Sequence, residues 1–102
     1  MTAERIRELN DAFRRSLSGG KVMMTSGVAA LSIVTKSKVL DRVRTFDAFT
    51  ADNDPHGEHD FGAFEVAGHK FFFKVDLYEE PGVKGTEPLT TRVLTIMLAD
   101  EY

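Results

Sequence analysis

The sequence predicts an α+β domain: an antiparallel sheet of about four to five strands with an N-terminal amphipathic helix and a second short helix packed on one face. Three observations support this prediction. A helical apolar pattern opens the chain, strand-like alternation fills its second half, and turns containing Gly and Pro separate the strands. With 102 residues and 42% hydrophobic content, the chain can bury one core but not two, so we expect a single domain over residues 1–102.

The first predicted element is an amphipathic helix from about Ala3 to Leu17. Its apolar residues recur at spacings of three and four, as on one face of a helix: Ile6, Leu9, Phe13 and Leu17. Thr2 is a suitable N-cap, and Ser18-Gly19-Gly20 should end the helix because glycine readily adopts the left-handed C-cap conformation. Arg14 and Arg15 are expected to extend the solvated basic side of this helix.

The next segment predicts shorter elements. Lys21–Thr25 has the composition of a short strand, whereas Val28–Thr35 fits helix and strand equally well. Ser37 is a suitable N-cap for a short helix that carries Val39, Leu40 and Val43 on one side. Phe46–Thr50 is predicted to be extended and to lead into an acidic loop.

The second half predicts a β-hairpin and a final strand. Phe64 and Val66 alternate with less apolar residues, and a turn is expected at Ala67-Gly68-His69. The following strand has one unbroken apolar row: Phe71, Phe73, Val75 and Leu77. Glu79–Leu89, which contains Pro81, Gly82, Gly85 and Pro88, is predicted to be a loop. Thr91–Leu98 is the predicted last strand, with a core row of Leu94, Ile96 and Leu98.

Composition excludes several classes of protein. The chain has no Cys, which excludes disulfides, thiol catalysis and thiolate metal sites. It has no signal-peptide pattern and no apolar run of the roughly 20 residues that a bilayer crossing needs, so we expect a soluble cytoplasmic protein that does not act at a membrane. The charge is +5 over residues 1–46 and −8 over residues 47–102, and we expect both signs to intermingle on the folded surface.

The acidic loop from Asp52 to Gly62 holds the most chemically active side chains. Its start resembles a calcium loop, but His56 and Ala63 occupy positions that need oxygen ligands. A transition metal is a second reading, with Asp54, Glu58, His59 and Asp60 as candidate ligands. In an extended segment Glu58 and Asp60 point away from His59, so such a site would need further ligands, such as Asp76, His69 or Glu101.

Two further interpretations differ in whether the side chains of this loop take part in catalysis. A carboxylate beside His59 would orient the imidazole for acid–base catalysis, which makes Glu58, His59 and Asp60 the candidate catalytic residues. The alternative is a structural loop, in which Asp and Asn side chains bond to backbone N–H groups and other carboxylates pair with basic residues such as Arg42 or Arg44. We favour the structural reading.

A second candidate surface lies on the long predicted strand. Phe72 and Tyr78 share one face with Lys70 and Lys74, an aromatic and basic combination that can stack nucleic-acid bases. The acidic second half of the chain disfavours nucleic acid, because it repels phosphate. We therefore expect a helix or a second subunit to cover this face.

Three stretches of the sequence resemble a bacterial family of unknown function, family 3768, which is associated chiefly with alphaproteobacteria. They are Leu9-Asn10-Asp11 with Phe13-Arg14, Asn53-Asp54-Pro55 with Glu58-His59-Asp60-Phe61-Gly62, and Arg92–Ala99 with Glu101-Tyr102. The sequence departs from the family at Phe73, where Trp is expected, at Leu77, where Tyr is expected, and at His56, where an aromatic is usual. The last departure makes His59 a better candidate than His56. The resemblance implies one intact domain and no particular activity.

The sequence therefore predicts a small cytoplasmic binding module without catalytic activity, which acts through protein–protein contacts. A homodimer across Phe72 and Tyr78 is one form that this hypothesis takes. We expect no cofactor, with a divalent metal as the alternative. The first alternative is a metal-dependent or acid–base enzyme centred on Glu58-His59-Asp60. The second is an accessory regulator from a mobile element that binds a host complex through an acidic face.

Overall fold

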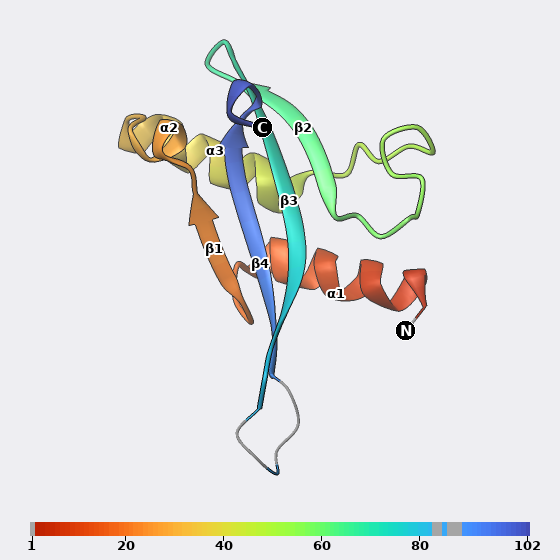
Figure 1. The fold of residues 1–102 in the computed structure, drawn as a ribbon. Coiled ribbons are helices and arrows are strands. Elements are labelled where there is room, and N and C mark those ends of the chain that lie inside the picture. The colour runs from red at the N-terminus through yellow and green to blue at the C-terminus, as the bar shows by residue number, and fades with distance from the viewer. Residues whose placement is uncertain (1, 83–84, 86–88) are drawn as a thin grey trace.

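The computed structural model describes residues 2–82, 85 and 89–102, and it has the predicted α+β architecture (Figure 1). Four strands form one sheet in the order β1-β4-β3-β2. The elements in chain order are α1 (Ala3–Ser16), β1 (Lys21–Met24), α2 (Ser26–Ala29), α3 (Ile33–Thr45), β2 (Phe61–Val66), β3 (His69–Glu80), β4 (Leu89–Leu98) and the 3₁₀ turn η1 (Ala99–Glu101). None of the helices in this part of the chain is long and apolar enough to cross a membrane.

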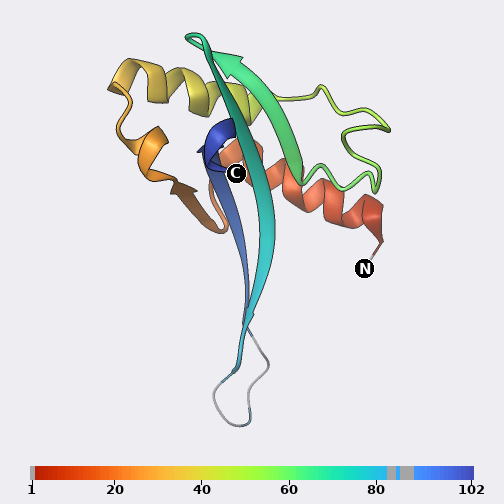
Figure 2. The ribbon, with the colours of Figure 1, turned by 45° about the horizontal axis from the view of Figure 1, so that its top comes forward.

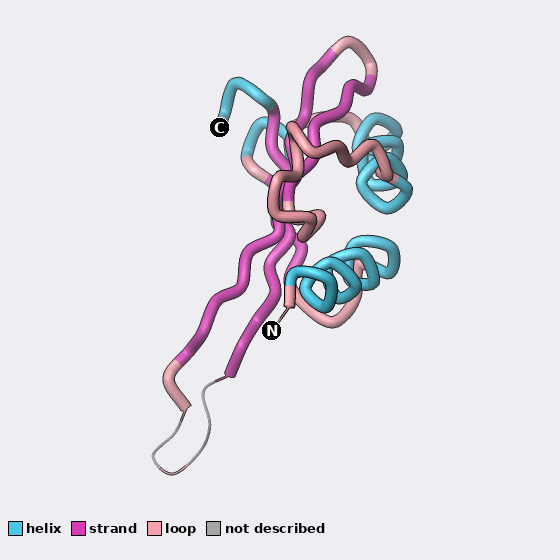
Figure 3. The backbone as a smooth tube through the Cα atoms, turned by 90° about the vertical axis from the view of Figure 1, so that its right-hand side faces the viewer, coloured by secondary structure: helices cyan, strands magenta, loops and turns pink. Residues whose placement is uncertain are grey.

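Helices α1 and α3 both lie on one face of the sheet (Figure 3). The core forms between them and the inner rows of β2, β3 and β4, and its members are Phe13, Val28, Val39, Val43, Phe46, Phe64, Val66, Phe71, Phe73, Val75, Leu94 and Ile96. Burying each such side chain contributes about 1.5–3 kcal/mol, so this face accounts for most of the hydrophobic stabilisation.

The sequence predicts an antiparallel sheet, but the observed sheet is mixed. β3 pairs antiparallel with both β2 and β4, but β1 runs parallel to β4 with Lys21 opposite Val93 and Met24 opposite Ile96. The reason lies in the connection that follows β1. Helices α2 and α3 carry the chain from β1 to β2 at the opposite edge of the sheet, and such crossovers join parallel strands. β3 then runs antiparallel to β2, and β4 antiparallel to β3, so β4 has the same direction as β1.

Helix α1 confirms the predicted N-cap, because the Thr2 hydroxyl accepts a hydrogen bond from the Arg5 N–H at 3.1 Å. Its C-terminal end differs from the prediction. The left-handed residue is Leu17 itself, with φ of 55°, and its N–H donates to the Phe13 carbonyl. The last helical residue is therefore Ser16, and Leu17 rather than a glycine provides the left-handed C-cap.

The segment that fits helix and strand equally well is helical at both ends and contains no strand. α2 ends at Ala29, and α3 begins at Ile33 after Ser32, whose hydroxyl accepts from the Thr35 N–H at 3.1 Å. Ser37 is thus an interior residue of α3 and not its N-cap, since the helix is already capped by Ser32, five residues before Ser37. Phe46–Thr50 follows α3 without strand pairing.

The β2–β3 hairpin confirms its prediction, with a two-residue turn at Ala67 and Gly68, whose φ values of 52° and 80° fit a type I′ turn. β3 and β4 are longer than predicted, so less of Glu79–Leu89 is loop; positions 83–84 and 86–88, including Pro88, lie outside the described residues. Beyond the reach of β1 and β2, β3 and β4 continue as a two-stranded ribbon (Figure 1, Figure 2).

Candidate functional site

The acidic loop begins with a turn that its own side chains hold. The Asn53 side chain accepts from the Thr50 N–H at 2.8 Å and donates to the Ala48 carbonyl at 3.0 Å. The Asp54 N–H donates to the Thr50 carbonyl, and the Gly57 N–H donates to the Asp54 carbonyl. This half of the loop follows the turn chemistry that the structural reading predicts.

The peptide bond between Glu58 and His59 is held from both sides. The Asn10 amide donates to the Glu58 carbonyl at 2.9 Å, and the His59 N–H donates to the Asp54 carboxylate at 3.2 Å. His59 has a φ of 54°, in the left-handed region that non-glycine residues rarely occupy. Both holding side chains, Asn10 and Asp54, are buried, which is how the surrounding structure maintains this conformation.

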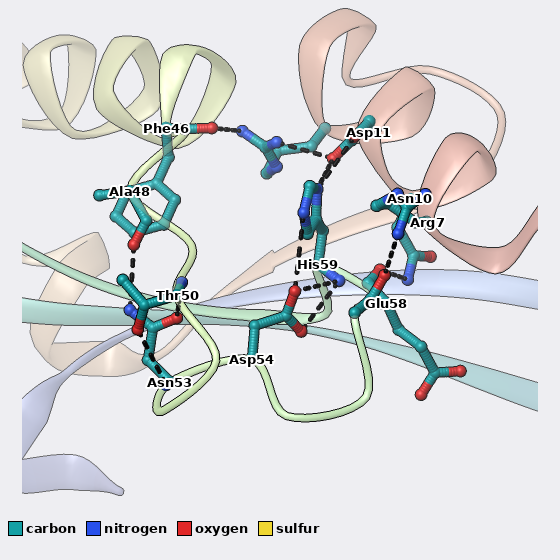
Figure 4. A network of polar contacts seen from close by, with 12 residues as sticks. Arg7, Asn10, Asp11, Phe46, Ala48, Thr50, Asn53, Asp54, Glu58 and His59 are labelled. Atoms are coloured by element: carbon teal, nitrogen blue, oxygen red, sulfur yellow. Dashed lines mark hydrogen bonds and ion pairs between the residues drawn. The ribbon is translucent and has the colours of Figure 1, made fainter. Parts of the chain in front are cut away.

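The His59 imidazole lies between two carboxylates (Figure 4). Its Nδ1 is 2.9 Å from Asp11 Oδ1 on α1, and its Nε2 is 3.6 Å from Asp54 Oδ2. The ring stacks on Phe49 with centroids 3.8 Å apart and planes at 5°. Both ring nitrogens therefore face protein carboxylates, and one ring face is covered by an aromatic side chain.

Arg14 completes this network from inside the protein. Its Nη2 donates to Asp11 at 3.0 Å, and its Nη1 donates to the carbonyls of Val43 and Phe46 at 2.8 and 2.7 Å. Arg14 is 1% exposed, so the prediction of a solvated side chain is wrong for it, while Arg15 is exposed as predicted. The carbonyls at the end of α3 provide the reason, because a guanidinium can satisfy them and Asp11 at once.

A second arginine supports the same loop from the sheet. Arg92 Nε on β4 donates to the Asn10 side-chain oxygen at 2.7 Å, and burial lowers the pKa of the Arg92 guanidinium below its ordinary value. Arg7 on α1 donates to the Gly57 carbonyl at 3.2 Å. The loop is thus attached to α1 at three places and, through Asn10, to the centre of the sheet.

The predicted catalytic and metal-binding residues line two different pockets. His59 lines a pocket of about 140 Å³ together with Asp11, Arg14 and Phe49, whereas Glu58 and Asp60 line another of about 220 Å³ beside Asp76. Across residues 2–82, 85 and 89–102, no group of three or more His, Asp or Glu side chains is arranged to hold a metal ion.

Other predicted partners of the loop lie elsewhere. Arg42 donates to the Glu65 carbonyl and Arg44 to the Arg15 carbonyl, so neither pairs with a loop carboxylate as the sequence had suggested. His56 is exposed on the turn. His69 opens β3 at the far end of the hairpin.

Glu101 organises the C-terminal end of the chain. Its carboxylate accepts hydrogen bonds from the Thr25 hydroxyl at 2.6 Å and from the N–H groups of Leu98 and Gly27. These bonds, with the Thr25 contribution the largest, lower the pKa of Glu101. The contacts hold η1 at the end of β4, from which Tyr102 reaches the sheet face opposite the helices.

That opposite face, which we call the open face, carries the predicted interaction residues. Phe72 is half-buried, because the rings of Phe61 and Tyr102 pack against it at centroid distances of 5.1 and 5.5 Å. Lys70 lies over the Phe72 ring, Lys74 is 3.4 Å from Asp76, and Tyr78 is 53% exposed. Neither α1 nor α3 lies on this side of the sheet, where η1 and the C-terminus are found instead (Figure 3).

Sequence reasoning missed the α1 side of the site, namely Asn10, Asp11 and Arg14, as well as Phe49 and Arg92. A usable signal was present in α1. Asn10 and Arg14 follow the apolar Ile6 at steps of four, which places these polar residues beside the core-facing stripe of the helix. Polar residues in such positions are buried with partners, as both are here.

Comparison with known proteins gives one match. The family model described as "Protein of unknown function (DUF3768)" matches residues 24–101. This range includes the acidic loop and β4, and it begins after α1. No curated protein and no solved structure matches the chain.

Proposed function

The chain belongs to the family described as "Protein of unknown function (DUF3768)", and from this premise we propose that it is a non-catalytic cytoplasmic binding module that acts through protein–protein contacts. The family description specifies no activity, so the proposal comes from the geometry. The observation that carries it is the open face, where Phe61, Phe72 and Tyr102 form an aromatic cluster on the side of the sheet away from α1 and α3 (Figure 3).

The exposure of single residues supports contact with a partner. Tyr78 and Met23 are 53% and 55% exposed, and both belong to the open face by strand register. Tyrosine and methionine are enriched in protein interfaces, where an amphipathic or adaptable side chain packs against a second surface. Lys70 and Lys74 add charge to this surface, which favours a protein partner of mixed polarity.

The loop network argues for a structural role of the candidate catalytic residues. A general base must present a nitrogen to its substrate, but both His59 nitrogens face Asp11 and Asp54. One observation favours an enzyme as the second candidate. The Asp11–His59 contact has the orientation of a carboxylate–imidazole pair, and opening of the Asp54 side would expose Nε2.

The experiment uses photo-crosslinking from two adjacent positions. Leu77 and Tyr78 are 48% and 53% exposed, but they point to opposite faces of β3. A benzoylphenylalanine probe at position 78 should give a crosslinked protein band in cells, and this band should disappear when Phe72→Lys is added. The probe at position 77 is the matched control. Equal crosslinking from both positions, or none from position 78, contradicts the proposal.

A further inference from the structure

The open face of β3 has a charge pattern that is complementary to its own reverse. Its residues in order are Lys70, Phe72 and Lys74, then Asp76, Tyr78 and Glu80. The first three are basic-aromatic-basic and the last three are acidic-aromatic-acidic, with Val75 at the midpoint. We propose that a second copy of this chain packs face to face on the open face, related by a two-fold axis that lies between the two sheets at the level of Val75. This inference rests on the proposed function and identifies its partner.

The two-fold axis determines which residues meet. An axis in the plane of the interface and perpendicular to the strands lays β3 antiparallel over the partner's β3, so that each position meets its mirror position about Val75. Lys70 then meets Glu80, Phe72 meets Tyr78, and Lys74 meets Asp76, each contact occurring twice. An axis along the strands would instead place Lys70 on Lys70 and Glu80 on Glu80. The charges therefore select the antiparallel arrangement.

The neighbouring strand does not oppose this arrangement. The open face of β4 has no charged residue among its described positions, which are Leu89, Thr91, Val93, Thr95 and Met97. On β1, Lys21 would lie opposite the partner's Met23, because Lys21 is level with Val93 and Met23 with Thr95. Glu65 on β2 is level with Lys70, so its mirror position is level with Glu80. The partner's β2 does not reach that level, because it begins level with Lys74, and Glu65 would have no β2 residue opposite it. Among these strand positions, no like charges are brought together.

The aromatic contacts and the sheet geometry also fit. Tyr78 would meet a cluster formed by Phe61, Phe72 and Tyr102, whose rings lie 5.1 to 6.1 Å apart. Aromatic pairs at such spacings stabilise interfaces beyond the area that they bury. Twisted sheets pack aligned face to face about 10 Å apart, which leaves room for one interdigitated layer of these side chains.

The size of the surface predicts a weak dimer. From Lys70 to Glu80, β3 spans about 33 Å, but only β3 and β4 extend over the whole of that length. Such a narrow strip lies at the low end of specific interfaces, below about 1,200 Å² of total buried area. We therefore expect a monomer–dimer equilibrium that depends on protein concentration in the micromolar range, roughly 1–100 μM.

The test is a charge swap between Lys70 and Glu80, read by sedimentation equilibrium. In one chain these residues are about 33 Å apart, well beyond the Debye length of about 8–10 Å, so they cannot couple within a monomer. Lys70→Glu and Glu80→Lys should each weaken dimerisation about tenfold, because each places like charges in contact twice. The double variant K70E/E80K should restore the wild-type dissociation constant to within about threefold.

Two outcomes overturn the inference. A wild-type chain that stays monomeric up to millimolar concentration has no such dimer. A dimer in which the two charge reversals simply add, without restoration in the double variant, uses another surface. Melting curves of all three variants confirm that each is folded. If the position-78 crosslink captures a different protein while the chain stays monomeric, the binding function stands and the homodimer is refuted.

Discussion

Replacing Arg14 with Met should destabilise the fold by about 3 kcal/mol, because a neutral side chain removes the donor from two buried carbonyls and one of the two partners of Asp11. The guanidinium bonds to Asp11 and to the carbonyls of Val43 and Phe46, and it is 1% exposed. Methionine keeps the apolar packing against Phe49 and Phe73, which lie 5.4 and 5.5 Å from the guanidinium carbon, so the polar loss is isolated.

The assay is urea denaturation followed by far-UV circular dichroism, with Arg15→Met as the matched control. Arg15 is the exposed neighbour on the same helix, and its replacement should change the free energy of unfolding by less than about 0.5 kcal/mol. In a domain of this size, 3 kcal/mol corresponds to a fall in Tm of about 15 °C. If Arg14→Met and Arg15→Met differ by less than about 1 kcal/mol, the guanidinium does not hold α1 to α3 as argued.

Three further predictions follow from other contacts. Gly62→Ala should lower the free energy of unfolding by about 1–3 kcal/mol, because an added Cβ would overlap the buried Phe73 ring. An unchanged midpoint in a denaturant titration would mean that the ring moves freely. Hydrogen bonds from Thr25 and two backbone N–H groups lower the pKa of Glu101. The stability that these bonds confer is therefore present above the unfolded pKa of Glu101 and is lost as the pH falls through its folded pKa. Glu101→Gln should be less stable than wild type at neutral pH, and the melting temperatures of the two proteins should converge in acid. Zinc or manganese should leave the Tm unchanged, and a metal-dependent rise that His59→Ala abolishes would support a metal site instead.

The parts of the fold that could be predicted are those that have a local pattern. The apolar spacing in α1 and the alternation in β3 each report one buried face, and both elements form where expected, although Leu77 at the end of the β3 row is 48% exposed. The parallel pairing of β1 could not be predicted, because its partner Val93 lies about 70 residues away and no turn between them sets the direction. Local pattern identifies an element, whereas its neighbour in the sheet depends on the whole chain.

The candidate site divides in the same way. The turn chemistry of Asn53 and Asp54 was predictable, since these side chains bond to backbone groups within five residues. The partner of His59 was not, because Asp11 lies 48 positions earlier, on an amphipathic helix whose polar side gave no sign of a contact with the loop. The spacing in α1 could indicate that Arg14 is buried, but not its bonding partners, because these carbonyls lie 29 and 32 positions later.

Whether a loop rich in carboxylates and imidazoles can act as a reactive site depends on which of its polar atoms are not already bonded within the protein. Asp54 uses its carboxylate on the His59 N–H and ring, and Asp11 divides its own between His59 and Arg14. An enzyme would have to break these contacts to expose a reactive nitrogen, at the cost of the bonds that hold α1 to the loop. The open face requires no such opening, since Tyr78 is already exposed there. Its aromatic and charged side chains can meet a partner in the conformation that the folded chain already has, and this difference in cost is why we place binding on the open face.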